Sequence, residues 1–221
     1  MLNFLLIGKH FHDNIDLSKL IPESGKPHKS INRLDKNKDI QMIYYQNNDL
    51  VIRNMIPTDA QAITDGEIAQ GWDQTVEKYN RRLHDQAAGR AIALVAESHG
   101  EVAGYLNVYP DSQWGSFGNQ GLPELIDFGV LEKYRHRGIG NKLMDVAEQI
   151  AAQYADRVYL GVGLHAGYGS AQRMYVKRGY VPDGTGVWYK NSICPPYSEC
   201  CNDDELVLYI VKSLTPLESN A

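Results

Sequence analysis

The sequence predicts a mixed α/β (α+β) domain, and three observations support this fold class. The chain has 221 residues, of which 43% are hydrophobic and 22% charged, as is typical of a globular protein with a sizeable core. Segments with strand and helix periodicity alternate along residues 49–215, as in helices packed on a largely paired sheet. The apolar segment 124–130 leads into a basic, glycine-containing turn and an amphipathic helix.

The periodic segments predict a mixed central sheet of about seven strands, flanked by about four helices. We expect strands at 50–56, 91–98, 101–109, 124–130, 157–163, 180–190 and 205–214. We expect helices at 58–71, 73–89, 139–151 and 170–179. His99 and Gly100 are the predicted turn between the second and third strands, and Gly71 and Gly89 the predicted ends of the first two helices.

The first 48 residues differ from the rest of the chain. Residues 22–39, PESGKPHKSINRLDKNKD, are polar, contain two prolines and carry scattered charges, which is typical of a loop or linker. We therefore expect an N-terminal extension or linker at 1–48, the folded domain at 49–215 and a short tail at 216–221.

Charge and cysteine usage exclude several kinds of partner. The formal net charge is −5, whereas nucleic acids and anionic membranes attract a basic surface, so we expect neither as a partner. The three cysteines, Cys194, Cys200 and Cys201, form no regular disulfide or zinc pattern, so we expect reduced thiols and no metal.

The opening apolar run, MLNFLLIG, is too short to span a bilayer, and we expect a cytoplasmic protein.

The turn after strand 124–130, in the segment EKYRHRGIGNKL (132–143), is a predicted anion site. A helix that begins there presents unpaired backbone N–H groups and the positive end of its dipole. Gly138 and Gly140 allow a phosphate to approach the backbone, and Arg135 and Arg137 add positive charge. The turn matches neither the GxxxxGK phosphate loop nor the GxGxxG fingerprint, and a solvated basic helix cap remains an alternative.

Two separated motifs resemble the GNAT superfamily of N-acetyltransferases. In VLEKYRHRGIG (130–140), an apolar strand residue is followed at the family's spacing by Arg135, Gly138 and Gly140. In AQRMYVKRGY (171–180), the alanine, the tyrosine and the glycine with its aromatic neighbour also match. The resemblance covers roughly residues 50–214 and implies a GNAT fold, in which two parallel strands splay to bind coenzyme A.

The resemblance also implies acetyl-CoA as the donor substrate. Its pyrophosphate would bind the turn, and its pantetheine arm would lie along strand 124–130 like an added strand. The implied cofactor-binding residues are Phe128, Val130, Arg135, His136, Arg137, Gly138, Ile139, Gly140 and Asn141. Tyr168 stands where the family commonly has an asparagine that contacts pantetheine, so the sequence departs from the family there.

Transfer to an amine needs a base for the ammonium and an acid for the leaving thiolate. The resemblance makes Glu124, at the start of its strand, the first candidate base; a chain of waters is the alternative that many relatives use. Asp127, the second choice, is expected on the opposite face of the strand because side chains alternate there. Tyr175 matches the family tyrosine near the coenzyme A sulfur and is the candidate acid.

The acceptor region is less defined by the sequence. Trp72, Tyr105 and Trp114 are candidate walls of an acceptor pocket, and neighbouring carboxylates, among them Glu67, would suit a cationic amine. The acceptor is expected to be a small cationic molecule or a protein amine, and a homodimer is a candidate assembly. Two alternatives stay open: a module that binds acyl-CoA without efficient catalysis, and an ATP- or sugar-nucleotide-binding protein.

Overall fold

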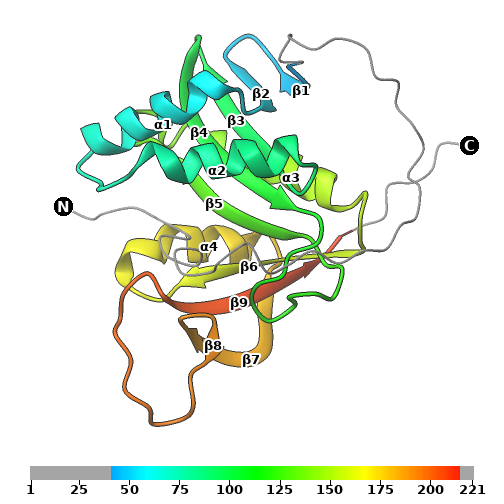
Figure 1. The fold of residues 1–221 in the computed structure, drawn as a ribbon, viewed down its shortest axis with the longest axis vertical. Helices are drawn as coiled ribbons and strands as arrows, with labels where there is room; N and C mark the ends of the chain where they lie inside the picture. Colours follow the sequence, from blue (N-terminus) through cyan, green and yellow to red (C-terminus); the bar gives the residue numbers. More distant parts are fainter. Residues whose placement is uncertain (1–40, 215–221) are drawn as a thin grey trace, which may run out of the picture.

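One nine-stranded sheet forms the centre of the part of the chain that the structure describes, residues 41–214 of a computed structural model (Figure 1). Its strand order is β1-β2-β3-β4-β5-β6-β9-β7-β8. The strands are β1 (Ile43–Gln46), β2 (Leu50–Asn54), β3 (Ile92–Ser98), β4 (Glu101–Tyr109), β5 (Glu124–Val130), β6 (Arg157–Gly163), β7 (Val181–Tyr189), β8 (Ser192–Ile193) and β9 (Leu206–Ser213). The helices are α1 (Pro57–Ala69), α2 (Val76–Ala87), α3 (Ile139–Ala151) and α4 (Gly169–Lys177), with short 3-10 turns η2 (Glu132–Tyr134) and η3 (Ala166–Tyr168).

The predicted mixed α/β class is confirmed, and so are the four predicted helices. The sequence did not predict β1 and β8. β1 lies inside the segment assigned to the extension, but it pairs antiparallel with β2 and so belongs to the sheet. Residues 1–40 and 215–221, which hold the rest of the predicted extension and the predicted tail, lie outside the described residues.

The helices cover both faces of the sheet. α1 and α2 pack on β3 and β4 around a core that includes Ile63, Tyr79 and Tyr105. On the opposite face, α3 and α4 pack over the larger core, to which they contribute Leu143 and Tyr175. Because side chains alternate between the two faces along each strand, the same strands contribute residues to both cores.

The sheet opens between β5 and β6. These two strands are parallel, and their pairing is confined to Glu124 and Tyr159, near the start of each strand. Beyond this pair the strands separate, whereas β6 pairs with β9 along its whole length. The predicted splay between the strands 124–130 and 157–163 is therefore present.

A bulge interrupts the alternation of side chains along β5 and corrects one prediction. Asp127 has φ 53, and the register of β5 against β4 shifts at this point. Leu125 and Phe128, three residues apart, therefore share the core beneath α3. Glu124 and Asp127 consequently lie on the same face of the strand, and the prediction that they lie on opposite faces was wrong.

The long loop 110–123 covers the part of the sheet that α1 and α2 leave open. Leu122 and Phe117 pack with Tyr159 and Tyr209 in a third apolar cluster. The loop approaches β9 so closely that a Cβ on Gly115 would overlap the ring of Tyr209. The loop is thus held over the sheet beside the first residue of β5.

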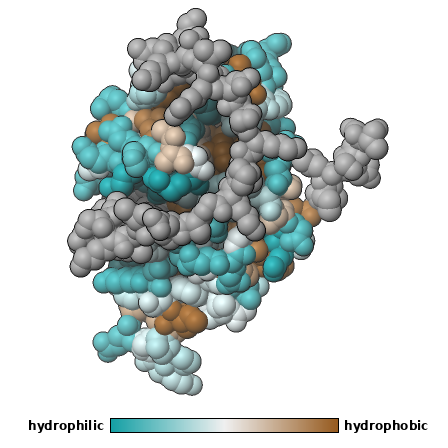
Figure 2. Space-filling model, turned by 45° about the vertical axis from the view of Figure 1, so that its right-hand side comes forward, coloured by the Kyte–Doolittle hydropathy of each residue, from teal (hydrophilic) through white to brown (hydrophobic). Residues whose placement is uncertain are grey.

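The face of the molecule in Figure 2 is mostly hydrophilic, with hydrophobic residues in separate small patches. Among residues 41–214, no helix has the length and apolar character needed to cross a membrane.

Candidate active site

The turn between β5 and α3 has the backbone of an anion site. Gly138 is the N-cap of α3, with φ 80, and no side chain of residues 41–214 caps the helix. The N–H groups of the first helical turn are therefore left for a ligand. A Cβ on Gly140 would lie 3.1 Å from the ring of Phe128, so glycine keeps the approach to this helix end open.

A pocket of about 660 Å³ opens at this turn. Its two walls come from segment 128–141 and from α4, and Trp72 contributes from the turn after α1. The lining residues are Trp72, Phe128, Gly129, Val130, Tyr134, Arg135, His136, Gly138, Ile139, Gly140, Asn141, Ser170, Ala171, Arg173, Met174, Lys177 and Arg178. Among the described residues that line it there are four Arg and Lys side chains and no Asp or Glu, although the chain as a whole is acidic.

The structure brings the predicted cofactor-binding residues together in this pocket, with the exception of Arg137. The Arg137 guanidinium lies 5.6 Å from the centre of the Tyr134 ring instead. Trp72, predicted as a wall of the acceptor pocket, lines the same cavity, where its ring lies 5.6 Å from the Arg135 guanidinium. Arg135 also donates to the Val130 carbonyl at 3.1 Å, which joins the turn to the end of β5.

Glu124 is 5% exposed at the start of β5. The Ser112 hydroxyl donates to its carboxyl group, and the Tyr159 hydroxyl oxygen lies 3.4 Å from it. Tyr159 donates its own proton to the Trp114 carbonyl at 2.7 Å, so Trp114 acts here through its backbone. Burial raises the pKa of Glu124 to about 8, because desolvation outweighs the hydrogen bond from Ser112 and the effect of the nearby Tyr159 hydroxyl.

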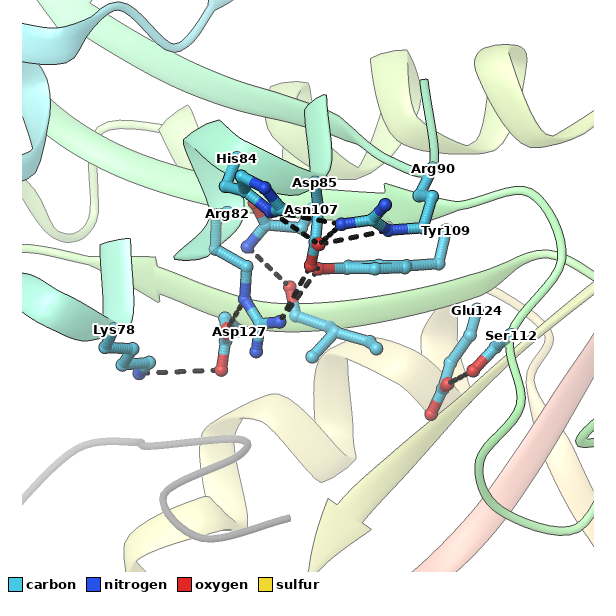
Figure 3. A network of polar contacts seen from close by, with 11 residues as sticks. Lys78, Arg82, His84, Asp85, Arg90, Asn107, Tyr109, Ser112, Glu124 and Asp127 are labelled. Atoms are coloured by element: carbon cyan, nitrogen blue, oxygen red, sulfur yellow. Dashed lines mark hydrogen bonds and ion pairs between the residues drawn. The ribbon is translucent and has the colours of Figure 1, made fainter. Parts of the chain in front are cut away.

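A buried polar network surrounds Asp127 on the α2 face of the sheet (Figure 3). Arg82 donates to the Asp127 carboxylate at 2.6 Å, and the Lys78 ammonium lies 3.5 Å from it. Arg82 also donates to the Tyr109 hydroxyl at 2.8 Å, and Tyr109 donates to Asp85 at 2.6 Å. Asp127 is therefore ion-paired with two cations, which favours its charged form and makes it a poor proton acceptor.

Tyr175 is fully buried in the core beneath α4. Its hydroxyl has no hydrogen-bond partner within residues 41–214, and burial raises its pKa, which keeps the phenol protonated. Tyr175 does not itself line the pocket, but Ala171 and Met174 on the same helix do. Tyr180 packs edge-on against it, with ring centres 5.7 Å apart.

Tyr168, where the sequence departs from the family pattern, is the last residue of η3 and packs against the end of β6. A Cβ on Gly163 would overlap the Tyr168 ring, so this ring packs directly on the strand. The Tyr168 hydroxyl donates to Asp204 at 2.8 Å, and His165 Nε2 lies 3.0 Å from the same carboxylate oxygen. His165 Nδ1 accepts from the Gly167 N–H at 3.0 Å, which assigns the proton of a neutral His165 to Nε2.

Tyr105, predicted in the acceptor pocket, is buried on the other side of β5. Its hydroxyl and that of Tyr79 both donate to Glu67, which is fully buried. Desolvation raises the pKa of Glu67. A Cβ on Gly129 would lie 2.6 Å from the Tyr105 hydroxyl, so this cluster supports β5 from behind the pocket.

Two sets of residues near the site were not predicted from the sequence. Lys78 and Arg82 appeared as ordinary polar positions of a helix, and only their burial reveals the network with Asp127. Arg173 and Lys177 lie four residues apart on α4, a spacing that predicts a shared helix face and could have been found. Among the described residues, no cluster of His, Cys, Asp or Glu has the arrangement of a metal site.

The family model described as the acetyltransferase (GNAT) family matches residues 60–180, more than half of the chain. The chain belongs to the GNAT family of acetyltransferases, which makes it an acetyl-CoA-dependent acyltransferase. No curated protein matches it in sequence.

Solved structures share the fold at low sequence identity. Ard1 from Thermoplasma volcanium has a TM-score of 0.55 and 19% identity, covering 76% of this chain and 99% of its own. The ribosomal-protein-S18-alanine N-acetyltransferase from Escherichia coli has a TM-score of 0.55 and 13% identity, covering 78% and 98%. YncA from Salmonella typhimurium, solved with its cofactor acetyl-CoA, has a TM-score of 0.55 and 18% identity, covering 79% and 98%. The predicted GNAT fold is confirmed.

Proposed function

We propose that this protein transfers an acetyl group from acetyl-CoA to a primary amine while both substrates are bound. The observation that carries the proposal is the position of Glu124 relative to the cationic pocket. Phe128 and Ile139 line the pocket from the α3 side of the sheet. On the opposite side, Asp127 contacts Arg82 of α2, and Glu124 contacts Ser112 of the loop 110–123. The two sides meet where β5 and β6 separate, an arrangement that favours direct transfer between two bound substrates.

The residues of the pocket fit acetyl-CoA. The uncapped first turn of α3 would bind the pyrophosphate, and Arg135, which lines the pocket beside this turn, would balance its charge. The unpaired edges of β5 and β6 would hold the pantetheine arm. When bound, acetyl-CoA supplies the thioester carbonyl that the amine attacks.

Glu124 and Tyr175 would then move the protons. The Glu124 carboxylate takes a proton from the ammonium, and the neutral nitrogen forms a bond to the carbonyl carbon. As the carbon–sulfur bond breaks, the Tyr175 phenol would donate its proton to the sulfur. The remaining extra proton of the amide nitrogen would return to the Tyr175 phenolate, and Glu124 would release its proton to solvent. Lys78 and Arg82 lie 3.5 Å and 2.6 Å from the Asp127 carboxylate and offset its charge. Glu124 has no such cation pair among the described residues, and burial raises its pKa to about 8.

The test is release of coenzyme A thiol from acetyl-CoA in the presence of a panel of amines. The panel contains a polyamine, an aminoglycoside and a peptide with a free α-amine; the peptide is included because the Escherichia coli neighbour is named for a protein alanine. We expect one class to accelerate thiol release, and we expect ATP not to compete with acetyl-CoA. Acetyl-CoA binding without amine-dependent release would support a binding module, and absence of binding would refute the proposed donor site.

A further inference from the structure

Arg173 and Lys177 differ from most other cationic side chains of the molecule. Many of the described Lys and Arg side chains lie next to a carboxylate, as Arg178 lies 2.8 Å from Asp145 and 2.9 Å from Glu148. Arg173 and Lys177 form no ion pair or hydrogen bond with any residue of the described range 41–214. Both are exposed, and both line the pocket.

Their spacing places these two charges on one face of α4. Residues four apart lie about 6 Å apart along a helix axis, and like charges at this spacing repel each other. No carboxylate among the described lining residues offsets them. A site that gathers unpaired positive charge in this way is complementary to a dianion.

The anion site at the start of α3 belongs to the other wall of the same pocket. It consists of backbone N–H groups and Arg135, and it needs nothing from α4 to bind one phosphate group. The cationic pair on α4 is therefore a second anion subsite. The pocket is built for a ligand whose negative charge lies at two separate positions.

We propose that Arg173 and Lys177 bind the 3′-phosphate of coenzyme A, an inference that rests on the proposed use of acetyl-CoA. Coenzyme A carries a pyrophosphate within its chain and a separate phosphomonoester on its ribose. A phosphomonoester carries a charge of about −1.5 to −2 at neutral pH, so it would gain most from two unpaired cations. The ligand chemistry thus matches the two subsites, and Arg173 and Lys177 select coenzyme A over its dephosphorylated form.

Calorimetric titration with coenzyme A and with dephospho-coenzyme A tests this inference without catalysis. We expect the wild type to bind coenzyme A about tenfold more tightly, as two exposed charge pairs would give. Arg173→Ala and Lys177→Ala should each reduce this ratio. The double variant should bind both ligands equally, with the affinity of the wild type for dephospho-coenzyme A.

Lys190→Ala is the matched control. Lys190 is also exposed and without an ion pair in the described part of the chain, but it lies between β7 and β8 and does not line the pocket. Its loss removes the same charge and should leave the ratio unchanged. A ratio that falls equally in Lys190→Ala would assign the preference to net charge and overturn the subsite.

The possible failures are distinguishable. Equal binding of both ligands by the wild type overturns this inference and leaves the proposed donor intact. A double variant that loses the same factor for both ligands also overturns it, because the pair would then serve the common part of the ligand. Binding of neither ligand by the wild type refutes the proposed donor itself. A ratio that declines as salt is added supports the charge pairing.

Discussion

Arg173 and Lys177 on α4 are exposed and unpaired within the described residues, whereas Lys78 and Arg82 on α2 are 6% and 5% exposed and contact Asp127. Buried cations must be paired, because an unpaired buried charge costs several kcal/mol. On the α2 side, the charged side chains therefore form ion pairs with one another inside the protein. The pocket side keeps charge available at the surface, where a ligand can neutralise it.

The comparison predicts different responses to mutation on the two sides of β5. Variants on the α2 side should alter proton transfer and stability, whereas variants on the pocket side should alter donor affinity.

Glu124→Gln should reduce kcat/KM by about a hundredfold or more, since a positioned base contributes at least this much. In the wild type, kcat/KM should rise with pH toward a midpoint near the Glu124 pKa of about 8, because the carboxylate is the active form. The variant should lose this rise while its acetyl-CoA affinity stays unchanged. A retained pH profile in steady-state assays would favour a chain of waters as the base.

Gly138→Val should weaken acetyl-CoA binding by about fiftyfold, because valine disfavours the φ of 80 that starts α3 and its side chain enters the anion site. Gly100→Val is the matched control. Gly100 has φ 81 in the hairpin between β3 and β4, and at both glycines an added Cβ would meet open space among the described residues. The control should lose stability but keep its calorimetric affinity for acetyl-CoA. Equal losses of affinity would show that backbone strain alone weakens the site.

The free energy of unfolding should depend on pH because the pKa of Glu124 is raised in the folded state. Its pKa is raised from 4.5 to about 8, so the folded state binds this proton more tightly than the unfolded state. Its contribution is complete below pH 4.5 and is lost as the pH rises through 8. Glu124→Gln should remove a decline of about 5 kcal/mol in the free energy of unfolding across this range. Urea unfolding at several pH values measures it, and parallel curves for both proteins would contradict the assigned pKa.

Tyr175→Phe should lower kcat about tenfold with little change in acetyl-CoA affinity, because it removes only the proton donor. Tyr180→Phe is its control, since Tyr180 packs against Tyr175 and its hydroxyl is also buried. The control should retain its kcat. Similar kcat values for Tyr175→Phe and the wild type, measured by thiol release, would exclude the acid role.

The sequence predicted those features that depend on local pattern. Gly138 and Gly140 with their flanking arginines locate the pocket because a glycine turn before an amphipathic helix is encoded within a dozen residues. β1 and β8 escaped prediction because four and two residues are too few to show a period of two. Pairing with longer neighbours, rather than their own sequence, makes them strands.

Other features depend on contacts between distant segments and left no pattern in the sequence. The bulge at Asp127 adds one residue to β5, which places Asp127 beside Arg82, 45 residues earlier. Trp72 follows α1 and was expected near the acceptor, but the fold places its ring against Arg135. Alternation and capping rules contain no information about either contact.

Arg178 gives the pocket a further property. Its guanidinium joins α4 to Asp145 and Glu148 of α3, and Glu148 also binds Lys212 of β9 at 2.6 Å. The two helices that form opposite walls of the pocket are thus tied into one frame. These contacts connect the two walls within the protein itself, without a ligand. In the proposed assignment of two anion subsites, this frame would set the spacing between them, so the pocket would select ligands by the spacing of their charges as well as by their number.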